Sequence, residues 1–400
     1  MVLFSSFSLS EPILNALKRM NYNEATPVQA EAIPLILQGC DLIALAQTGS
    51  GKTAACAIPL CDIIDTGSSL PQVLVVVPTR ELALQYATEA QEIGRNKGVK
   101  AFALFGGEDY SMQTSKLRDG VHFLVATPGR LIDFIYSRSI DLTKVVSLVL
   151  DEADEMLSMG FYEDLEFIIH CLVQKPQKLL FSATMPPQIR TIAKKHMKDP
   201  VEISLVSHQV SPEEIDHHFV WCHQRNKVAD LIKVMKQLEP KQALIFCRSR
   251  DECEAVCCAL KKQFSGVDYL HAGQSQDVRT IVTSKFRAGK VRFLVATDVA
   301  SRGLDFSGVT HVFIFHLASD PDLYLHRSGR TGRYGQKGIV VTLVTDRELS
   351  SLQLILKKIG RHAQWLGPEP AALKKCATTN YTTGQRESSR GRVTKIDPTL

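Results

Sequence analysis

Residues 41–53 read Asp41-Leu42-Ile43-Ala44-Leu45-Ala46-Gln47-Thr48-Gly49-Ser50-Gly51-Lys52-Thr53. The first part, 41–46, is a short apolar run of the kind that forms a buried strand, and a helix-length segment follows Lys52. Small residues in the loop between them let backbone N–H groups surround phosphates at the start of a helix, where the helix dipole favours anions. The stretch therefore predicts a strand, a phosphate-binding loop and a helix.

The loop matches the pattern GxxxxGK[ST], except that Ala46 stands at its first glycine. Lys52 can reach the β- and γ-phosphates of a nucleotide, and the hydroxyl of Thr53 suits Mg²⁺. A glycine-rich turn without a ligand is the alternative, and the strand–loop–helix context argues against it. The predicted nucleotide-binding residues of the loop are Ala46, Gln47, Thr48, Gly49, Ser50, Gly51, Lys52 and Thr53.

On both sides of this unit, short apolar runs alternate with helix-length amphipathic stretches. The runs lie at 41–46, 73–77, 122–126, 145–150 and 178–181, and then at 243–246, 291–296, 311–315 and 339–344. Continuous apolar strands separated by helices are typical of parallel sheets that are buried on both faces. We therefore predict an α/β protein of two tandem domains, each a mostly parallel sheet with helices on both faces.

A polar stretch without apolar periodicity separates the two halves and predicts a flexible linker over 206–216. The domains are then 1–205 and 217–365, both of ordinary size. Residues 366–400 carry six Lys/Arg and three acidic residues and are rich in small polar residues, which favours a basic, disordered tail. An inert terminus and a weak RNA-holding arm are both open interpretations of this tail.

The composition limits the function only loosely. The chain of 400 residues carries 47 Lys+Arg against 42 Asp+Glu, a net charge of +5 that permits a nucleic-acid partner without demanding one. No apolar run approaches the ~20 residues of a membrane span, and no export signal is recognisable. We expect a cytoplasmic monomer that does not contact membranes. Ten cysteines without a CxxC pattern, including Cys253, Cys257 and Cys258 on one predicted helix, favour free, buried or semi-buried thiols over zinc.

Acidic residues follow the apolar run 145–150 directly. Asp151 and Glu152 begin the sequence Asp-Glu-Ala-Asp at the carboxyl end of a predicted strand, where open α/β sheets bind ligands. Acids after a strand often only cap a helix. Together with the upstream phosphate loop, however, they predict that Asp151 holds Mg²⁺ and that Glu152 orients or deprotonates the attacking water.

These segments together make the chain resemble the DEAD-box RNA helicases of superfamily 2, over residues 4–365 and in a short, core-only form similar to bacterial members. The resemblance implies two RecA-like domains and ATP hydrolysis that depends on RNA, with ATP and Mg²⁺ bound between the domains. It also implies single-stranded or short duplex RNA as the partner, and possible partners in ribonucleoprotein complexes.

The segment 22–29 resembles the family's Q motif. Thr26 can cap a helix with Pro27 in its first turn, and the amide of Gln29 matches an adenine edge. The resemblance implies that Tyr22 stacks on the base and that ATP is preferred over GTP. Asn21 stands where the family usually has glycine, and asparagine tolerates the same left-handed backbone.

Arginines recur at a spacing of three in the segment 326–333, which resembles motif VI. On one helix they would share a face, and a solvated basic surface is the alternative interpretation. The resemblance implies that Arg330 and Arg333 reach across the cleft to the γ-phosphate as arginine fingers. It makes Lys52, Asp151, Glu152, Arg330 and Arg333 the predicted catalytic residues, and it implies that the domains close for hydrolysis.

Two further segments carry roles that only the resemblance implies. The segment 297–305 resembles motif V, with Thr297 on an RNA phosphate and Asp305 on the ATP ribose. Ser182 and Thr184 resemble motif III, which couples the ATP site to the RNA site. Without the family, this segment is only a turn at the end of a strand.

Small donors, glycines and arginines follow several predicted strands. Such groups suit contacts to phosphate and sugar and carry no base code, so we expect single-stranded RNA to be bound through its backbone and 2′-hydroxyls without sequence preference. Each segment alone resembles an ordinary turn, and their order along the chain favours RNA. The predicted RNA-binding residues are Thr79, Arg80, Gly107, Thr127, Arg130, Gln276, Arg279 and Thr297.

Three functions remain open at this point. An RNA helicase is favoured, an ATP-gated RNA clamp with slow turnover uses the same residues, and a DNA translocase is disfavoured because such relatives usually carry DExH and lack the Gln29 segment. Residues 315–318, Phe-His-Leu-Ala, also depart from the family's usual Tyr-Asp-Leu-Pro. This departure predicts an altered cleft loop and softer coupling between RNA and ATP.

Overall fold

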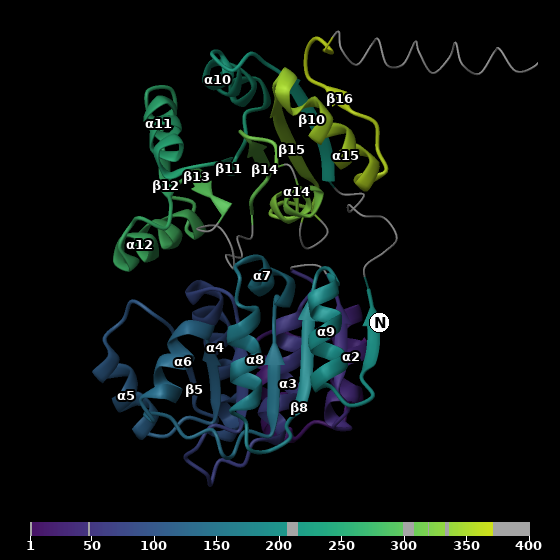
Figure 1. Cartoon of the computed structure of the whole chain (residues 1–400), viewed down its shortest axis with the longest axis vertical. Coiled ribbons are helices and arrows are strands. Elements are labelled where there is room, and N and C mark those ends of the chain that lie inside the picture. Colours follow the sequence, from purple (N-terminus) through teal and green to yellow (C-terminus); the bar gives the residue numbers. More distant parts are fainter. Residues whose placement is uncertain are drawn as a thin grey trace, which may run out of the picture.

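The computed structural model describes residues 2–46, 49–205, 215–298, 308–318, 320–332 and 336–370, with the backbone alone at Gln276. Within these residues, two seven-stranded sheets form two domains, which lie one above the other in Figure 1. Every strand pair in both sheets is parallel. The prediction of two tandem α/β domains is therefore confirmed.

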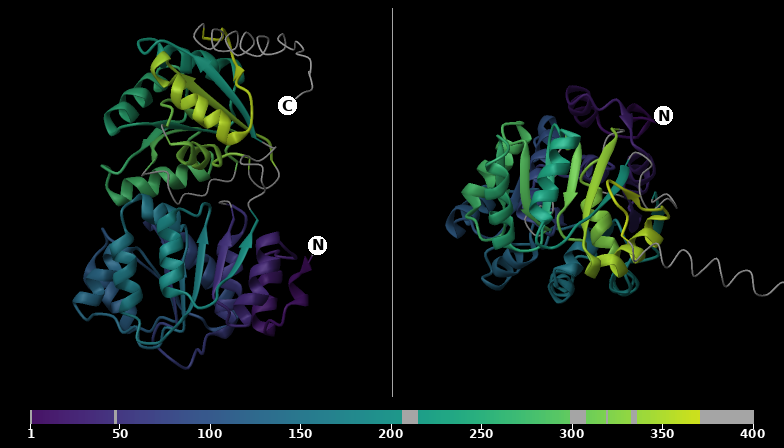
Figure 2. Two further views of the ribbon diagram at one scale, coloured as in Figure 1. Left: turned by 45° about the vertical axis from the view of Figure 1, so that its right-hand side comes forward. Right: turned by 90° about the horizontal axis from the view of Figure 1, so that it is seen from above.

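The first sheet has the strand order β5-β6-β4-β7-β8-β3-β9. Its strands are β3 (Leu42–Leu45), β4 (Val73–Val76), β5 (Ala101–Leu104), β6 (Phe123–Ala126), β7 (Ser147–Leu150), β8 (Gln177–Ser182) and β9 (Val201–Ser204). One face is covered by α1 (Glu11–Arg19), α2 (Pro27–Leu37), α3 (Lys52–Ile63) and α4 (Arg80–Gly94). The other face is covered by α5 (Tyr110–Arg118), α6 (Pro128–Tyr136), α7 (Ala153–Ser158), α8 (Tyr162–His170) and α9 (Pro187–His196). A small antiparallel pair, β1 (Val2–Leu3) with β2 (Glu24–Ala25), ties down the N-terminal segment at the flank of this domain (Figure 2).

The second sheet has the strand order β12-β13-β11-β14-β15-β10-β16. Its strands are β10 (Ile215–Trp221), β11 (Ala243–Cys247), β12 (Val267–Leu270), β13 (Phe293–Thr297), β14 (His311–Ile314), β15 (Gly338–Val344) and β16 (Gln364–Trp365). One face packs on α10 (Lys227–Leu238) and α11 (Arg250–Lys261), and the other on α12 (Gln276–Arg287), α14 (Pro321–Ser328) and α15 (Leu349–Ile359).

The apolar runs located the central strands except β10, whose polar residues 216–218 interrupt any apolar run, and they missed the edges. The four strands at the sheet edges, β5, β9, β12 and β16, fall outside the predicted runs. An edge strand has a neighbour on one side only and keeps polar or exposed positions, as in β9, where only Ile203 is buried. A criterion of continuous apolar residues detects strands that are buried on both faces and overlooks the others.

The domain boundaries differ slightly from the predicted ones. Strand β10 begins at Ile215, inside the predicted linker 206–216, and residues 206–214 lie outside the described residues. At the other end, the backbone N–H of Leu366 donates to the carbonyl of Phe219 at 2.8 Å, so the fold continues past residue 365. Residues 371–400 of the predicted tail are also outside the description.

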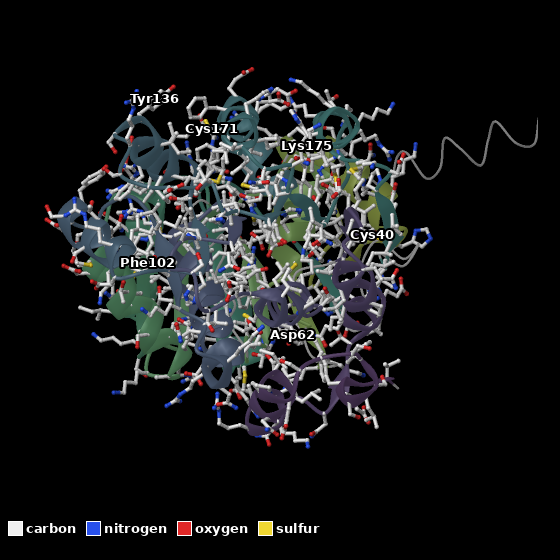
Figure 3. All side chains as sticks on the ribbon, turned by 90° about the horizontal axis from the view of Figure 1, so that it is seen from below. Cys40, Asp62, Phe102, Tyr136, Cys171 and Lys175 are labelled. Carbon is white, nitrogen blue, oxygen red and sulfur yellow. The ribbon has the colours of Figure 1, made fainter. Side chains whose placement is uncertain are left out.

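All strands of the first sheet run in the same direction, so their carboxyl ends lie together at one end of the sheet and their amino ends at the other. The carboxyl ends of the strands face the second domain, while Figure 3 shows the opposite end, where Cys40 and Lys175 precede β3 and β8.

On α11, Cys253 and Cys257 are buried, but Cys258 is exposed rather than semi-buried. The described residues contain no group of three or more His, Cys, Asp or Glu side chains that could hold a metal ion. None of the helices they form has both the length and the apolar character needed to cross a bilayer.

Candidate active site

The phosphate loop opens into a cavity of about 670 Å³ at the junction of the two domains. Gly49, Gly51, Lys52 and Thr53 line this cavity, and Gln47 and Thr48 lie outside the described residues. Gly51 is the N-cap of α3 with φ of +94°, a left-handed conformation that favours glycine. The loop and the helix N-terminus thus have the predicted strand–loop–helix form.

Lys52 and Gly51 are held by contacts within the first domain. The Lys52 side chain is buried, and its Nζ donates to the carbonyl of Ala46 at 2.9 Å, which spans the base of the loop. A Cβ atom added to Gly51 would approach Nε2 of Gln29 to 2.6 Å. Only glycine therefore leaves room for the contact between the loop and the Q-motif glutamine.

Two buried carboxylates stand at the carboxyl end of β7 beside the loop. Oδ1 of Asp151 accepts from the backbone N–H of Glu152 at 2.8 Å, and both residues line the cavity. Glu152 has φ of +52°, an uncommon backbone for a non-glycine residue that turns the chain sharply into α7. Burial raises the pKa of Asp151 to about 6, and the ammonium of Lys52 offsets only part of this rise. The charge of Lys52 therefore compensates the buried carboxylate of Asp151 only in part. This carboxylate and the hydroxyl of Thr53, which lines the same cavity, are oxygen ligands that fit a hard divalent cation.

The Q-motif residues form the other wall of the cavity. Gln29 Oε1 accepts from the Thr26 backbone N–H at 2.9 Å, and its Nε2 donates to the carbonyl of Gly51 at 3.2 Å. Thr26 is the N-cap of α2 with Pro27 in the first turn, as predicted. Asn21 has φ of +60°, which confirms the predicted left-handed backbone at the position of the usual glycine.

The aromatic wall contains one residue that the sequence did not reveal. Phe4 lines the cavity and stacks on Tyr22, with ring centroids 6.2 Å apart. The Tyr22 hydroxyl donates to Oε1 of Glu89 on α4 at 3.0 Å. Phe4 lies far upstream in an unremarkable segment, so no local pattern could have identified it.

The second domain contributes Arg330 to the same cavity. Helix α14 ends at Ser328, so Arg330 lies in the following turn and does not share a helix face with Arg327. Arg327 instead makes a bidentate pair with Asp298, at 2.7 Å for both contacts. Arg333 and Asp305 lie outside the described residues.

Asp154 links the acidic turn to Ser182 and Thr184. Its Oδ2 accepts from the backbone N–H of Thr184 at 2.9 Å and from the Thr184 hydroxyl at 2.8 Å, and its backbone N–H donates to Ser182 Oγ at 3.2 Å. No role for Asp154 was predictable from the sequence, because its partners are distant in the chain. Ser182 itself is fully buried at the end of β8.

His326 of the second domain approaches the same turn. Its Nε2 lies 3.8 Å from Asp154 Oδ2, and its Nδ1 lies 3.7 Å from Glu155 Oε2. Burial alone would lower the pKa of His326, but the hydrogen bond to Glu155 and the charges of Asp154 and Glu155 outweigh it and raise the pKa. A protonated His326 would therefore strengthen the contact between the two domains.

The predicted RNA-binding residues of the first domain gather after β4, β5 and β6. Thr79 caps α4, accepting from the Leu82 backbone N–H at 3.3 Å, and Thr127 is the N-cap of α6. Gly107 has φ of +90°, and a Cβ atom there would meet the Arg80 guanidinium at 2.3 Å. The Arg130 guanidinium donates to the side chain of Gln113 at 3.0 Å and to a backbone carbonyl, which fixes its orientation.

In the second domain, Arg279 projects from α12 toward the first domain. Its Nη2 lies 2.5 Å from Oε1 of Glu81, and both side chains are largely buried. Thr297 ends β13, and the side chain of Gln276 is outside the description. Arg279 therefore makes a contact across the domain boundary that the sequence did not predict.

We expect Arg279→Ala to weaken RNA binding in the presence of a non-hydrolysable ATP analogue by at least about tenfold, because truncating one partner of a buried interfacial pair costs about 2–5 kcal/mol. The double variant Glu81→Arg with Arg279→Glu should recover most of this affinity, since it restores the pair with the charges exchanged. Fluorescence anisotropy with labelled RNA measures both. Failure of the double variant to recover would show that Arg279 acts through the RNA itself.

The fold and the cavity define a two-domain nucleotide-hydrolysing enzyme whose site is completed across a cleft. Residues 26–192 match the family model described as DEAD/DEAH box helicase, and residues 226–335 match the Helicase conserved C-terminal domain. CshA of Geobacillus kaustophilus, a DEAD-box ATP-dependent RNA helicase, is 41% identical over 368 residues, which are 92% of this chain and 79% of the relative. The chain belongs to the DEAD-box ATP-dependent RNA helicase family, which confirms the predicted resemblance and enzyme class.

Solved structures of the family share the arrangement of both domains. Dbp5 of S. cerevisiae bound to RNA and ADP BeF3 superposes with a TM-score of 0.84 at 26% identity, covering 95% of this chain and 99% of that one. Mss116p bound to ssRNA and AMP-PNP gives a TM-score of 0.83 at 30% identity, covering 96% and 82%. The tandem RecA-like fold is thereby confirmed.

Proposed function

We propose that the chain hydrolyses ATP in the cavity between its domains when RNA brings them together, and that it thereby separates short RNA duplexes or remodels ribonucleoprotein complexes. The observation that carries this proposal is the position of Arg330. It lines the same cavity as Lys52, Asp151 and Glu152 although it comes from the other domain. Hydrolysis then requires closure of the cleft.

In this proposal, each charged group of the cavity has one task. Glu152 orients the attacking water and accepts its proton, while Lys52 and Arg330 stabilise the charge that develops on the transferred phosphoryl group. Thr53 and Asp151 are the residues that would hold Mg²⁺, which supplies positive charge to the phosphates when bound. Arg333 and Asp305 keep the roles that the family resemblance implies.

The base-binding end of the cavity supports ATP as the nucleotide. Tyr22, stacked on Phe4, offers an aromatic surface for adenine, and Gln29 keeps one amide hydrogen free of the bond to Gly51 for a base edge. The contact between Gln29 and Gly51 also means that a bound base and the phosphate loop affect each other directly. We assign adenine selectivity to this contact.

Coupling to RNA runs through Asp154 in this proposal. The Ser182 and Thr184 contacts of Asp154 tie the catalytic turn to the end of β8, and His326 reaches the same carboxylate from the second domain. A shift of either domain therefore moves the turn that carries Glu152. Such a two-sided contact gives RNA binding a physical route to the water-activating group.

RNA is proposed to bind along the carboxyl ends of the strands of both sheets. Thr79, Arg80, Gly107, Thr127 and Arg130 lie there in the first domain, and Thr297 lies at the equivalent edge of the second. Dbp5 and Mss116p, which share the arrangement, are bound to RNA in their solved structures. Hydroxyls, backbone amides and guanidinium groups support contacts to the RNA backbone. The proposal includes a monomer that works in the cytoplasm.

The test is ATP hydrolysis with and without single-stranded RNA, beside single-stranded DNA of the same length. We expect RNA to raise the rate and DNA to leave it near the basal level, followed by ATP-dependent separation of a short RNA duplex. Binding of ATP and RNA with almost no turnover would instead indicate an RNA clamp. Equal stimulation by DNA would indicate a translocase with no preference for RNA.

A further inference from the structure

His316 lies in a cluster of charged side chains next to α14, the helix that precedes the turn carrying Arg330. It follows β14 in the segment 315–318, where the family's usual pattern has an acidic residue. The cluster brings together α10, α11, the turn η3 (Asp346–Glu348) and the end of β14, which lie in the upper domain of Figure 1. Its other charged members are Glu252, Glu348 and Lys227.

The imidazole is held by two carboxylates. Nε2 of His316 lies 2.6 Å from Oε1 of Glu252, and Nδ1 lies 3.5 Å from Oε1 of Glu348. Lys227, which is only 1% exposed, places Nζ 3.2 Å from Glu348 Oε2 and 3.4 Å from His316 Nδ1. Two carboxylates against one ammonium leave one uncompensated negative charge, which an imidazolium at position 316 neutralises.

The same segment also contacts α14 just before the turn that carries Arg330. The carbonyl of His316 accepts from Nη1 of Arg327 at 2.6 Å, and the backbone N–H of Leu317 donates to Glu348 Oε1 at 3.2 Å. Arg327 is buried and bidentate with Asp298, at 2.7 Å for both contacts. Arg330 enters the cavity three residues after Arg327. The carbonyl of His316 is therefore, with Asp298, one of the two partners that hold Arg327 just before the turn that carries Arg330.

We propose that His316 is a positioning residue for Arg330: as an imidazolium it neutralises Glu252 and Glu348, fixes the carbonyl that holds Arg327, and so makes turnover depend on its own protonation. The inference rests on the proposed function of Arg330. An aspartate at this position would place three carboxylates around Lys227, so Glu252 and Glu348 are matched to histidine in this chain.

The pKa values agree with this geometry. The hydrogen bonds of Glu252 and Glu348 raise the pKa of His316, while burial and Lys227 oppose them. Burial would raise the pKa of Glu348, but the bonds from His316 and Thr345 and the charge of Lys227 lower it to about 2. Because the pKa of His316 is raised on folding, its contribution is complete below about 6.5, the usual value for histidine, and disappears as the pH rises through the folded-state value.

The first test compares kcat for RNA-saturated ATP hydrolysis in wild type and His316→Asn. Asparagine keeps a donor for Glu252 and carries no charge. At about pH 6 we expect wild type to be about tenfold faster, a factor that corresponds to about 1.4 kcal/mol of transition-state stabilisation. This ratio should approach one as the pH rises through the pKa of His316, with little change in KM for ATP. A ratio that does not vary with pH would overturn the proposal.

A second variant separates positioning from a general loss of folding. Adding Glu252→Gln to His316→Asn removes the uncompensated carboxylate, so we expect kcat to return to within about threefold of wild type, a difference of under 1 kcal/mol. No recovery in this double variant would contradict the charge-matching argument. His362→Asn, at an exposed histidine of the same domain, is the matched control and should keep the wild-type pH profile.

A measurement without catalysis distinguishes this inference from the proposed function. The free energy of unfolding of wild type, measured by denaturant titration, should fall relative to that of His316→Asn as the pH rises from about 6.5 through the raised pKa of His316, because only wild type loses the imidazolium. This difference is expected even if RNA fails to stimulate hydrolysis. Identical pH dependence of the two unfolding curves would show that the imidazolium is not part of the cluster.

Discussion

Glu152→Gln is expected to reduce RNA-stimulated ATP hydrolysis by about 10²–10⁴-fold, the range that a positioned general base contributes. The amide has nearly the same shape as the carboxylate, so the sharp turn at Glu152 and the contact of its backbone N–H with Asp151 remain. Binding of ATP and RNA should therefore persist, since Lys52, Gln29 and the RNA-facing residues are unchanged. Steady-state phosphate release and anisotropy with labelled RNA measure the two properties separately.

Glu163→Gln is the matched control for this variant. Glu163 is an exposed glutamate on α8 of the same domain, outside the cavity, and its replacement should leave hydrolysis within about twofold of wild type, as is usual for surface substitutions. If Glu152→Gln hydrolyses ATP at the wild-type rate, the assignment of the water-activating group to Glu152 is wrong. A loss of ATP binding would instead point to a structural role for its charge.

Arg330→Ala is expected to lower kcat by about 10³–10⁵-fold, the effect of removing an arginine that stabilises phosphoryl-transfer charge. ATP affinity should change little, because the phosphate loop and the Q motif both belong to the first domain. Arg330→Lys should recover only part of the rate, since an ammonium cannot offer the planar set of donors of a guanidinium. Single-turnover hydrolysis with saturating RNA measures the chemical step directly.

Arg225→Ala serves as the control for Arg330→Ala because Arg225 is an exposed arginine of the second domain that does not line the cavity. We expect it to retain wild-type turnover. Undiminished hydrolysis in Arg330→Ala would mean that the first domain completes the reaction alone. The requirement for domain closure would then have to be abandoned.

Elements with a local signal could be predicted from the sequence. The run before Gly49 identified β3, the loop predicted the start of α3, and the acids at 151–152 fell at the end of β7, because burial on both faces imposes continuous apolar residues. The left-handed Asn21 and the cap at Thr26 were also predictable, since one or two residues fix those conformations. Edge strands such as β9 were not, because they lack that apolar continuity.

The contacts between residues that are distant in the chain, by contrast, became known from the folded structure alone. The bonds of Asp154 to Thr184, the pairing of Arg279 with Glu81 and the stacking of Phe4 on Tyr22 all join segments that are separate in the chain. Likewise, the sequence showed that His316 departs from the family pattern, but not that Glu252 and Glu348 surround it. Periodicity reports the local backbone and its burial, whereas a charge acquires its function from partners that the folded chain brings within a few ångströms.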